Sequence, residues 1–360
     1  MTAFPRTTAE LSPGLLTEAL AEQWRGTRVS SVTVVDEAHC DTGSASTAAR
    51  AVLDLTYERD PADLPGRMVL KTVLVRPGAP GSMYLNEVRF YRRIRPDLSI
   101  ETPRCYAATY DEASGSFGLL LEDLTARGAR FPDAREAMSV ERMATLLDHL
   151  ASLHATWWAD PRLDTELDWL WTPYSGGFHD FLDSMGLEFI RGQMERSEYK
   201  QALLADRLGR SLDDLWVDLW RAQELVASEP TTLLHGDTHF GNTYLLPDGG
   251  VGLLDWQLLQ RGRWCHDVTY ALVTSLSVED RRRHERELLA GYLDALGRRG
   301  VGPPSLDEAW ECHRRVAIWG FLVGWFLTPI ENYGPEILHA NLDRLATALE
   351  DLGTIAALAR

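Results

Sequence analysis

The stretch Leu233-Leu-His-Gly-Asp-Thr-His-Phe-Gly-Asn242, followed by Gly252-Leu-Leu-Asp-Trp256, decides how this chain is interpreted. In both segments polar side chains come directly after an apolar run, a pattern that predicts two turns at the ends of buried strands. Asp237 and Asn242 lie on the first turn, and Asp255 lies on the second. Two carboxylates and an amide supply the hard oxygen ligands that Mg²⁺ prefers.

These three side chains suit phosphoryl transfer from a metal-bound nucleotide. Asp237 would accept or orient the proton of the attacking hydroxyl, while Asn242 and Asp255 would bind Mg²⁺ across the phosphates. Positioning and charge stabilisation should matter more than strong basicity, because the transition state is loose. Read one at a time, each residue could equally be an ordinary turn or strand-end residue. Their combined spacing favours the catalytic interpretation.

Two histidines flank the predicted catalytic aspartate. His235 follows the apolar run, and we expect it to bond backbone groups and fix the loop. His239 stands where a cation often lies near the transferring phosphate, so a protonated His239 is a candidate donor to that phosphate. A surface histidine is the alternative for His239.

The spacing His-x-Asp-x-x-x-x-Asn matches the catalytic loop of protein kinases, and Asp255 takes the place of the aspartate in Asp-Phe-Gly. However, this chain reads His235-Gly-Asp237 and Asp255-Trp-Gln257. Those departures resemble the aminoglycoside phosphotransferase and choline/ecdysteroid kinase-like family of small-molecule kinases. Leu153-His-Ala-Thr-Trp-Trp158 also resembles a feature of the ecdysteroid kinase-like members.

The resemblance implies an α+β, bilobal, protein-kinase-like fold. Strand-like patterns come first and helical patterns follow, which agrees with a sheet lobe and a helical lobe. We expect residues 1–122 to form a nucleotide-binding lobe with an antiparallel sheet. Residues 123–360 would form a larger helical lobe that carries catalysis and the substrate site. The expected strands are 32–35, 51–57, 68–75, 103–110 and 117–121, and the expected helices include 12–24, 85–94 and 140–158.

Lys71 lies at the centre of the apolar segment Val69-Leu-Lys-Thr-Val-Leu74, where an ammonium needs partners. The resemblance implies that it binds a nucleotide phosphate and pairs with Glu87 on the following helix. A lysine on the solvent face of the strand is the alternative.

Two further nucleotide contacts are expected from position alone. Ser44 and Ser46 lie in the small, polar segment 41–47, whose backbone N–H groups and hydroxyls could approach phosphate. This segment lacks a GxGxxG pattern, and a plain hairpin turn remains possible. The resemblance places an interlobe hinge at the end of the last strand, with adenine contacts at Glu122 and Leu124. It also implies that Asp267 caps the next helix and braces the catalytic loop.

The predicted function is therefore ATP-dependent transfer of the γ-phosphate to a hydroxyl of a small molecule, with GTP possible as donor. A catalytically silent, nucleotide-binding regulatory module of the same fold is the alternative. A protein kinase is disfavoured, because the segment 256–267 is short and no Ala-Pro-Glu follows it.

The acceptor is left open between an aminoglycoside, a choline-like alcohol, a sterol-like alcohol and another hydroxylated compound. Aromatic side chains concentrated after residue 150 favour a partly apolar site. Trp157 and Trp158 could surround a quaternary ammonium. An aminoglycoside would need acidic residues near Asp237, and the candidates are Asp307, Glu308, Glu331 and Glu336.

Composition excludes several classes of partner. The chain has 360 residues, with Lys+Arg 36 and Asp+Glu 53, and its net charge of −17 argues against nucleic-acid binding. Four separated cysteines show no metal-binding spacing and suggest a reduced, cytoplasmic protein. The longest uncharged run, Val316 to Ile330, is shorter than the ~20 residues of a membrane span, so no membrane partner is expected. The sequence does not predict the oligomeric state.

Overall fold

The computed structural model describes residues 4–5, 7–38, 48–59, 61, 63–72 and 81–359. The chain divides into two compact units, Met1–Asp97 with Thr102–Arg130, and Leu98–Glu101 with Phe131–Arg360. The predicted lobe boundary after residue 122 remains a prediction.

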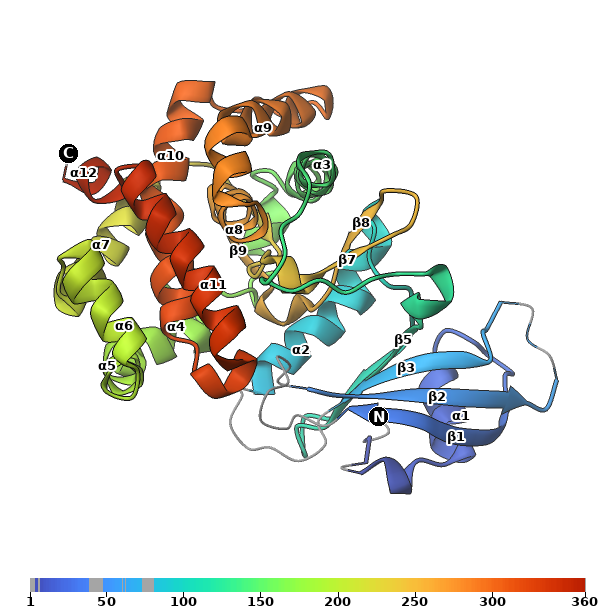
Figure 1. Cartoon of the computed structure of the whole chain (residues 1–360). Helices are drawn as coiled ribbons and strands as arrows, with labels where there is room; N and C mark the ends of the chain where they lie inside the picture. Colours follow the sequence, from blue (N-terminus) through green and yellow to red (C-terminus); the bar gives the residue numbers. More distant parts are fainter. Residues whose placement is uncertain are drawn as a thin grey trace. The chain divides into compact units, whose positions relative to one another are not determined.

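A five-stranded antiparallel sheet forms most of the first unit, in the order β1-β2-β3-β5-β4 (Figure 1). Its strands are β1 (Val29–Ala38), β2 (Ala49–Tyr57), β3 (Arg67–Thr72), β4 (Cys105–Tyr110) and β5 (Phe117–Glu122). Side chains alternate across each strand, so apolar residues such as Leu53, Met68 and Leu120 share one buried core with helix α1. Each of the five predicted strand segments overlaps one of these strands.

Helix α1 (Pro13–Leu20) begins as predicted, because the Ser12 side chain accepts a hydrogen bond from Leu15 N–H. The predicted end at Trp24 is wrong, since the helix stops at Leu20. Trp24 instead lies in the following turn and donates its indole N–H to the Tyr106 carbonyl at 3.1 Å. A side-chain hydrogen bond to β4 therefore takes the place of another helical turn.

The remaining helix of the first unit is α2 (Gly81–Arg89), which continues as a wider π-helical turn over Phe90–Ile94. It covers the predicted helix 85–94. The predicted third strand extended to Val75, but residues 73–80 lie outside the described residues.

The second unit is mostly helical, and the predicted fold class is confirmed. Its main helices are α3 (Val140–Thr156), α5 (Leu187–Glu195), α7 (Leu212–Leu225), α8 (Cys265–Ser275), α9 (Val278–Arg298), α10 (Leu306–Trp319) and α11 (Ile330–Asp351). Short helices α4 (Gly177–Phe181), α6 (Glu198–Ala202) and α12 (Thr354–Leu358) complete it. Helix α3 packs on α9, and α8 packs on α10.

Two small antiparallel ladders carry the turns singled out in the sequence. β6 (Thr231–Leu234) pairs with β9 (Gln260–Arg263), and β7 (Thr243–Leu245) pairs with β8 (Val251–Leu253). Each strand is only three or four residues long, so its pairing fixes little more than the ends of the turns.

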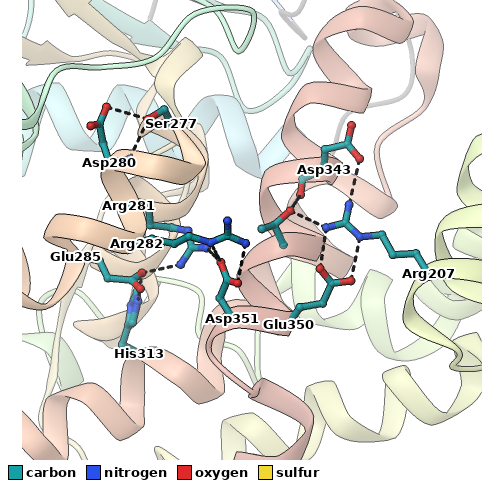
Figure 2. A network of polar contacts seen from close by, with 11 residues as sticks. Arg207, Ser277, Asp280, Arg281, Arg282, Glu285, His313, Asp343, Glu350 and Asp351 are labelled. Atoms are coloured by element: carbon teal, nitrogen blue, oxygen red, sulfur yellow. Dashed lines mark hydrogen bonds and ion pairs between the residues drawn. The ribbon is translucent and has the colours of Figure 1, made fainter.

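A network of ion pairs ties α9 to α10 and α11 (Figure 2). Arg281 is 1% exposed and donates to Glu285 at 2.8 Å and to Asp351. His313 on α10 lies 3.5 Å from the same Glu285 carboxylate. Because a buried guanidinium needs charged partners, this network fixes the relative positions of the three helices.

The predicted burial of the apolar run Val316 to Ile330 holds for the end of α10 and the π-helical turn Gly320–Phe326, apart from the half-buried Gly324. Leu327 to Ile330 are half-buried. A Cβ added at Gly320 or Gly324 would lie 2.8 Å or 2.5 Å from the Tyr270 side chain, so both glycines allow a close approach. Among the described residues, no helix is both long and apolar enough to span a membrane.

Candidate active site

Asp237 and Asn242 are in direct contact on the turn between β6 and β7. Asn242 Nδ2 donates to Asp237 Oδ2 at 2.8 Å and to the Asp237 carbonyl at 3.0 Å. Both amide hydrogens are thereby used, which leaves Oδ1 as the remaining polar atom of this side chain. The amide thus orients one carboxylate oxygen and has an acceptor left for a further ligand.

Asp255 lies on the second turn in a left-handed backbone conformation, with φ 62° and ψ 74°. Such a conformation is uncommon for residues other than glycine and often marks a functional position. Its neighbour Leu254 connects the two turns. Leu254 N–H donates to the Asn242 carbonyl at 2.8 Å, and the Leu254 carbonyl accepts from His235 Nε2 at 2.8 Å.

The turns hold several negative charges in a poorly solvated place. Burial, with the charge of Asp255 as the next cause, raises the pKa of Asp237 to about 7. A cation would relieve this repulsion, so the donor set fits a divalent ion at Asn242 Oδ1 and Asp255. The described residues include no group of three or more His, Cys, Asp or Glu side chains able to hold a metal. Water or phosphate oxygens would therefore have to complete the ion's shell, as Mg²⁺ allows.

Asp267 holds the turn of Asp237 through two backbone hydrogen bonds. Its Oδ2 accepts from His235 N–H at 2.7 Å, and its Oδ1 accepts from Gly236 N–H at 2.9 Å. The predicted capping role is wrong, because Trp264 occupies the cap position of α8 and Asp267 lies inside the first turn. Burial is the largest single influence on Asp267 and would raise its pKa, but the hydrogen bond to His154, the charges of His154 and His235 and the bond from Gly236 N–H together lower the pKa.

Gly236 makes this bracing possible. Its φ is 85°, and an added Cβ would lie 2.1 Å from the Leu258 carbonyl oxygen. Only glycine fits there, which explains why the motif reads His-Gly-Asp at this point.

The contacts of His235 agree with a structural role. Nε2 donates to the Leu254 carbonyl, and Nδ1 accepts from Asp237 N–H at 3.2 Å. Both ring nitrogens face backbone groups, so the ring tautomer follows from its partners. Because both ring nitrogens bond backbone groups, positioning of Asp237 remains the predicted role of His235.

His239 lies beside the Asp237 carboxylate. Its Nε2 is 3.7 Å from Asp237 Oδ2, and its Nδ1 accepts from Gly241 N–H at 3.1 Å. Burial lowers the pKa of His239 to about 4, so the ring is neutral near pH 7. Any donation to phosphate would therefore come from a neutral Nε2–H. The rings of Trp325 and Tyr333 lie edge-on to His239, at 5.3 and 6.2 Å between centroids.

In the first unit, Lys71 and Glu87 form the predicted ion pair. The Lys71 ammonium on β3 lies 2.7 Å from Glu87 Oε2 on α2, and the two side chains are 4% and 1% exposed. The alternative of a solvent-facing lysine is excluded by this burial. A role in nucleotide binding remains a prediction.

The other predicted nucleotide contacts are only partly described. Ser44 and Ser46 lie outside the described residues. Glu122 ends β5, and Leu124 begins a short turn in which its carbonyl accepts from Ala129 N–H at 3.2 Å. An adenine contact at Leu124 would therefore use its N–H.

Several residues considered for acceptor binding already have structural partners. The Arg162 guanidinium lies 4.3 Å above the Trp157 ring, which removes that face from any ligand cation. Glu308 forms a capping box with Ser305 at the start of α10. Asp307 pairs with Arg286, and Glu336 pairs with Arg135 at 3.6 Å. These contacts weaken the choline-like and aminoglycoside interpretations.

The sequence pattern alone did not reveal the partners that support Asp267. His154 Nε2 lies 3.3 Å from Asp267 Oδ2, and His154 Nδ1 lies 2.7 Å from the Tyr292 hydroxyl. His154 is fully buried on the apolar face of α3. A histidine in such a position needs polar partners, so its place on the apolar face of the helix was the sequence signal for a buried polar contact.

Comparison with known proteins supports the same fold. A sequence model described as the ecdysteroid kinase-like family matches residues 45–299. The structure of the GDP complex of aminoglycoside 2'-phosphotransferase-IIIa aligns with TM-score 0.53 and 11% identity, covering 95% of this chain and 99% of that one. Ethanolamine kinase from Plasmodium vivax aligns with TM-score 0.53 and 10% identity, covering 95% and 84%. At such identities the structures show the fold alone. A search among curated proteins finds no match.

Proposed function

The chain belongs to the ecdysteroid kinase-like family, and from this premise we propose that it transfers the γ-phosphoryl group of ATP to a hydroxyl of a small molecule. One observation carries the proposal. Asp237 and Asn242 are in contact at 2.8 Å on a turn that Leu254 ties to the turn of Asp255. This is the set of oxygen ligands and proton acceptor that phosphoryl transfer needs.

In the proposed reaction, the acceptor oxygen forms a bond to the γ-phosphorus while the bond to the nucleoside diphosphate breaks. Asn242 already engages Asp237 Oδ2, so Asp237 Oδ1 would receive the hydroxyl proton. The neutral His239 would contribute a hydrogen bond near this carboxylate rather than a positive charge.

Asn242 Oδ1 and Asp255 would bind Mg²⁺, which neutralises phosphate charge when present. Lys71, held by Glu87 at 2.7 Å, would bind phosphate oxygens of the nucleotide. The aminoglycoside 2'-phosphotransferase-IIIa structure is a GDP complex, so GTP belongs beside ATP as a candidate donor. The hinge contacts at Glu122 and Leu124, and the phosphate contacts at Ser44 and Ser46, are part of the same proposal.

For the acceptor we propose a hydroxylated compound with an apolar body. The rings of Tyr270, Trp325 and Tyr333 surround His239, which lies beside Asp237. Tyr270 and Trp325 are buried, whereas the half-buried Tyr333 offers apolar surface close to the proposed reacting group.

The test is a phosphate-transfer screen with ATP and GTP, in the presence of Mg²⁺, over sterols, aromatic alcohols, sugars, aminoglycosides and amino alcohols. The expected result is a phosphorylated alcohol whose formation requires Asp237. If nucleotide binds but no acceptor gains phosphate, the chain is a silent nucleotide-binding module and the proposal is wrong. The preference among acceptors distinguishes an apolar alcohol from an aminoglycoside or a choline-like compound.

A further inference from the structure

A small cavity of about 180 Å³ lies in the second unit beside strand β9. Its lining includes Thr172, Tyr174, Gln223, Thr231, Arg261 and Arg263. Asp237, Asn242 and Asp255 are not among its lining residues. The cavity is therefore separate from the proposed reaction centre.

Two arginines from one strand contribute to this cavity. Arg261 and Arg263 are two residues apart on β9, so their side chains leave the strand on the same face. Arg263 donates to the hydroxyl of Thr231 at 2.6 Å and to the carbonyls of Glu229 and Ala227. Burial lowers the pKa of this guanidinium.

Within the described part of the chain, no carboxylate lies within ion-pair distance of Arg263. Carbonyl and hydroxyl dipoles satisfy hydrogen bonds, but they do not cancel a full charge. Glu229 acts on Arg263 only from beyond ion-pair distance, so the charge of this half-buried cation beside the cavity is compensated only in part.

The cavity lining also includes donors that lack acceptors. Gln223 on α7 is 2% exposed, and its Nε2 has no hydrogen-bond partner among the described residues. The same is true of Arg261 Nε, although other Arg261 atoms donate to the Leu163 carbonyl and pair with Asp164. Buried donors without acceptors are rare and costly in folded proteins.

We propose that this cavity is a binding site for an oxyanion, either inorganic phosphate or sulfate or the carboxylate of a small metabolite. Arg263 supplies the charge, and Gln223 and Arg261 supply the additional donors. Two acidic neighbours reduce this charge without forming an ion pair with Arg263. Asp164 also lines the cavity, and its 82% exposed side chain pairs with Arg261. A Glu229 carboxylate oxygen accepts from Trp264 Nε1 at 3.2 Å, and its charge still acts on Arg263.

The β6–β9 ladder connects the proposed anion site to the turns of Asp237 and Asp255. β9 follows the turn of Asp255, and its partner β6 leads directly into the turn of Asp237. An anion that bridges β9 and α7 would stabilise the ladder in which the first turn begins and the second turn ends. This inference does not depend on the proposed kinase reaction.

The experiment measures thermal unfolding and binding heat of the full chain with phosphate, sulfate or acetate, at constant ionic strength adjusted with sodium chloride. We expect a saturable rise in Tm in the wild type. Gln223→Leu, which removes a donor without an acceptor, should fold normally and weaken binding by about three- to ten-fold. Arg263→Gln should weaken it by about ten-fold or more. If phosphate binds and acetate does not, the ligand is a tetrahedral anion. If acetate binds and phosphate does not, the ligand is a carboxylate.

The matched control is Arg283→Gln on the surface of α9, whose side chain is 63% exposed. It should bind anions as the wild type does. The proposal is overturned if no oxyanion gives a saturable shift. It is also overturned if Gln223→Leu binds as tightly as the wild type, because the anion would then lie elsewhere. If Arg263→Gln fails to fold, the Gln223→Leu comparison decides alone.

Discussion

At the scale of single residues, Asp237 is the group on which the proposed reaction most depends. Asp237→Asn keeps the shape of the side chain but removes the proton acceptor. We expect kcat to fall by about 10²- to 10⁴-fold, with little change in nucleotide affinity. Single-turnover kinetics on the identified acceptor provides the measurement. Near-wild-type turnover in this variant would show that Asp237 is not the acceptor of the proton.

A second prediction at this scale concerns acid stability. Burial lowers the pKa of His266 from 6.5 to about 4, so the unfolded chain binds this proton more tightly than the folded chain. The contribution of neutral His266 to the free energy of unfolding is therefore fully present above pH 6.5. It is lost as the pH falls towards 4, by up to about 3 kcal/mol. His266→Gln should remove this contribution. Denaturant unfolding of both proteins at pH 7 and pH 4.5 measures it, and parallel pH profiles would contradict the assignment.

At the scale of elements, β3 and α2 are joined by the buried pair of Lys71 and Glu87. Lys71→Met should destabilise the protein by about 3–5 kcal/mol, because it leaves Glu87 buried without its cation. The double variant Lys71→Met with Glu87→Leu should recover most of this loss, since replacing a whole buried pair by apolar groups is often neutral.

Nucleotide binding should not recover in the double variant. Equilibrium unfolding and nucleotide titration of the three proteins separate the two effects. Recovery of stability without recovery of binding would show that the pair is kept for function. Recovery of both would remove Lys71 from the proposed nucleotide site.

The contact between α8 and the turn after α10 gives a packing prediction. A Cβ at Gly324 would meet the Tyr270 hydroxyl at 2.5 Å, so Gly324→Ala should cost about 1–3 kcal/mol through overpacking. Gly297→Ala in α9 is the control, because nothing lies within 4 Å of its added Cβ. It should be neutral or stabilise by up to about 1 kcal/mol. Chemical denaturation compares them, and equal effects would mean that the close approach is unimportant.

At the scale of the whole molecule, nucleotide binding should appear as added stability. With Mg²⁺ and a non-hydrolysable ATP analogue at 100 times its Kd, the free energy of unfolding should rise by about 2.7 kcal/mol. Asp255→Ala should lose the part of this rise that depends on Mg²⁺, whereas Asp237→Asn should keep it. Thermal shifts with and without chelator test this, and a metal-independent rise in the wild type would argue against Asp255 as a ligand.

The sequence predicted those features whose signals are local. Short runs of apolar, β-branched and aromatic residues marked the five strands of the first unit, and the spacing of Asp237, Asn242 and Asp255 marked the two turns. It failed where partners are distant. β9 was missed because Gln260-Arg-Gly-Arg263 has no apolar alternation, and its pairing with β6 is entirely tertiary. Asp267 was assigned to a cap, although its partner His154 lies 113 residues away along the chain.

The two backbone hydrogen bonds of Leu254 have a consequence for how the site forms. The N–H and the carbonyl of this residue on the second turn both bond to the first turn, at Asn242 and His235, so local opening of either turn breaks these two bonds. The two turns should consequently order and fray as one cooperative segment. A partly assembled site, with the aspartates of only one turn in place, would not be a populated state.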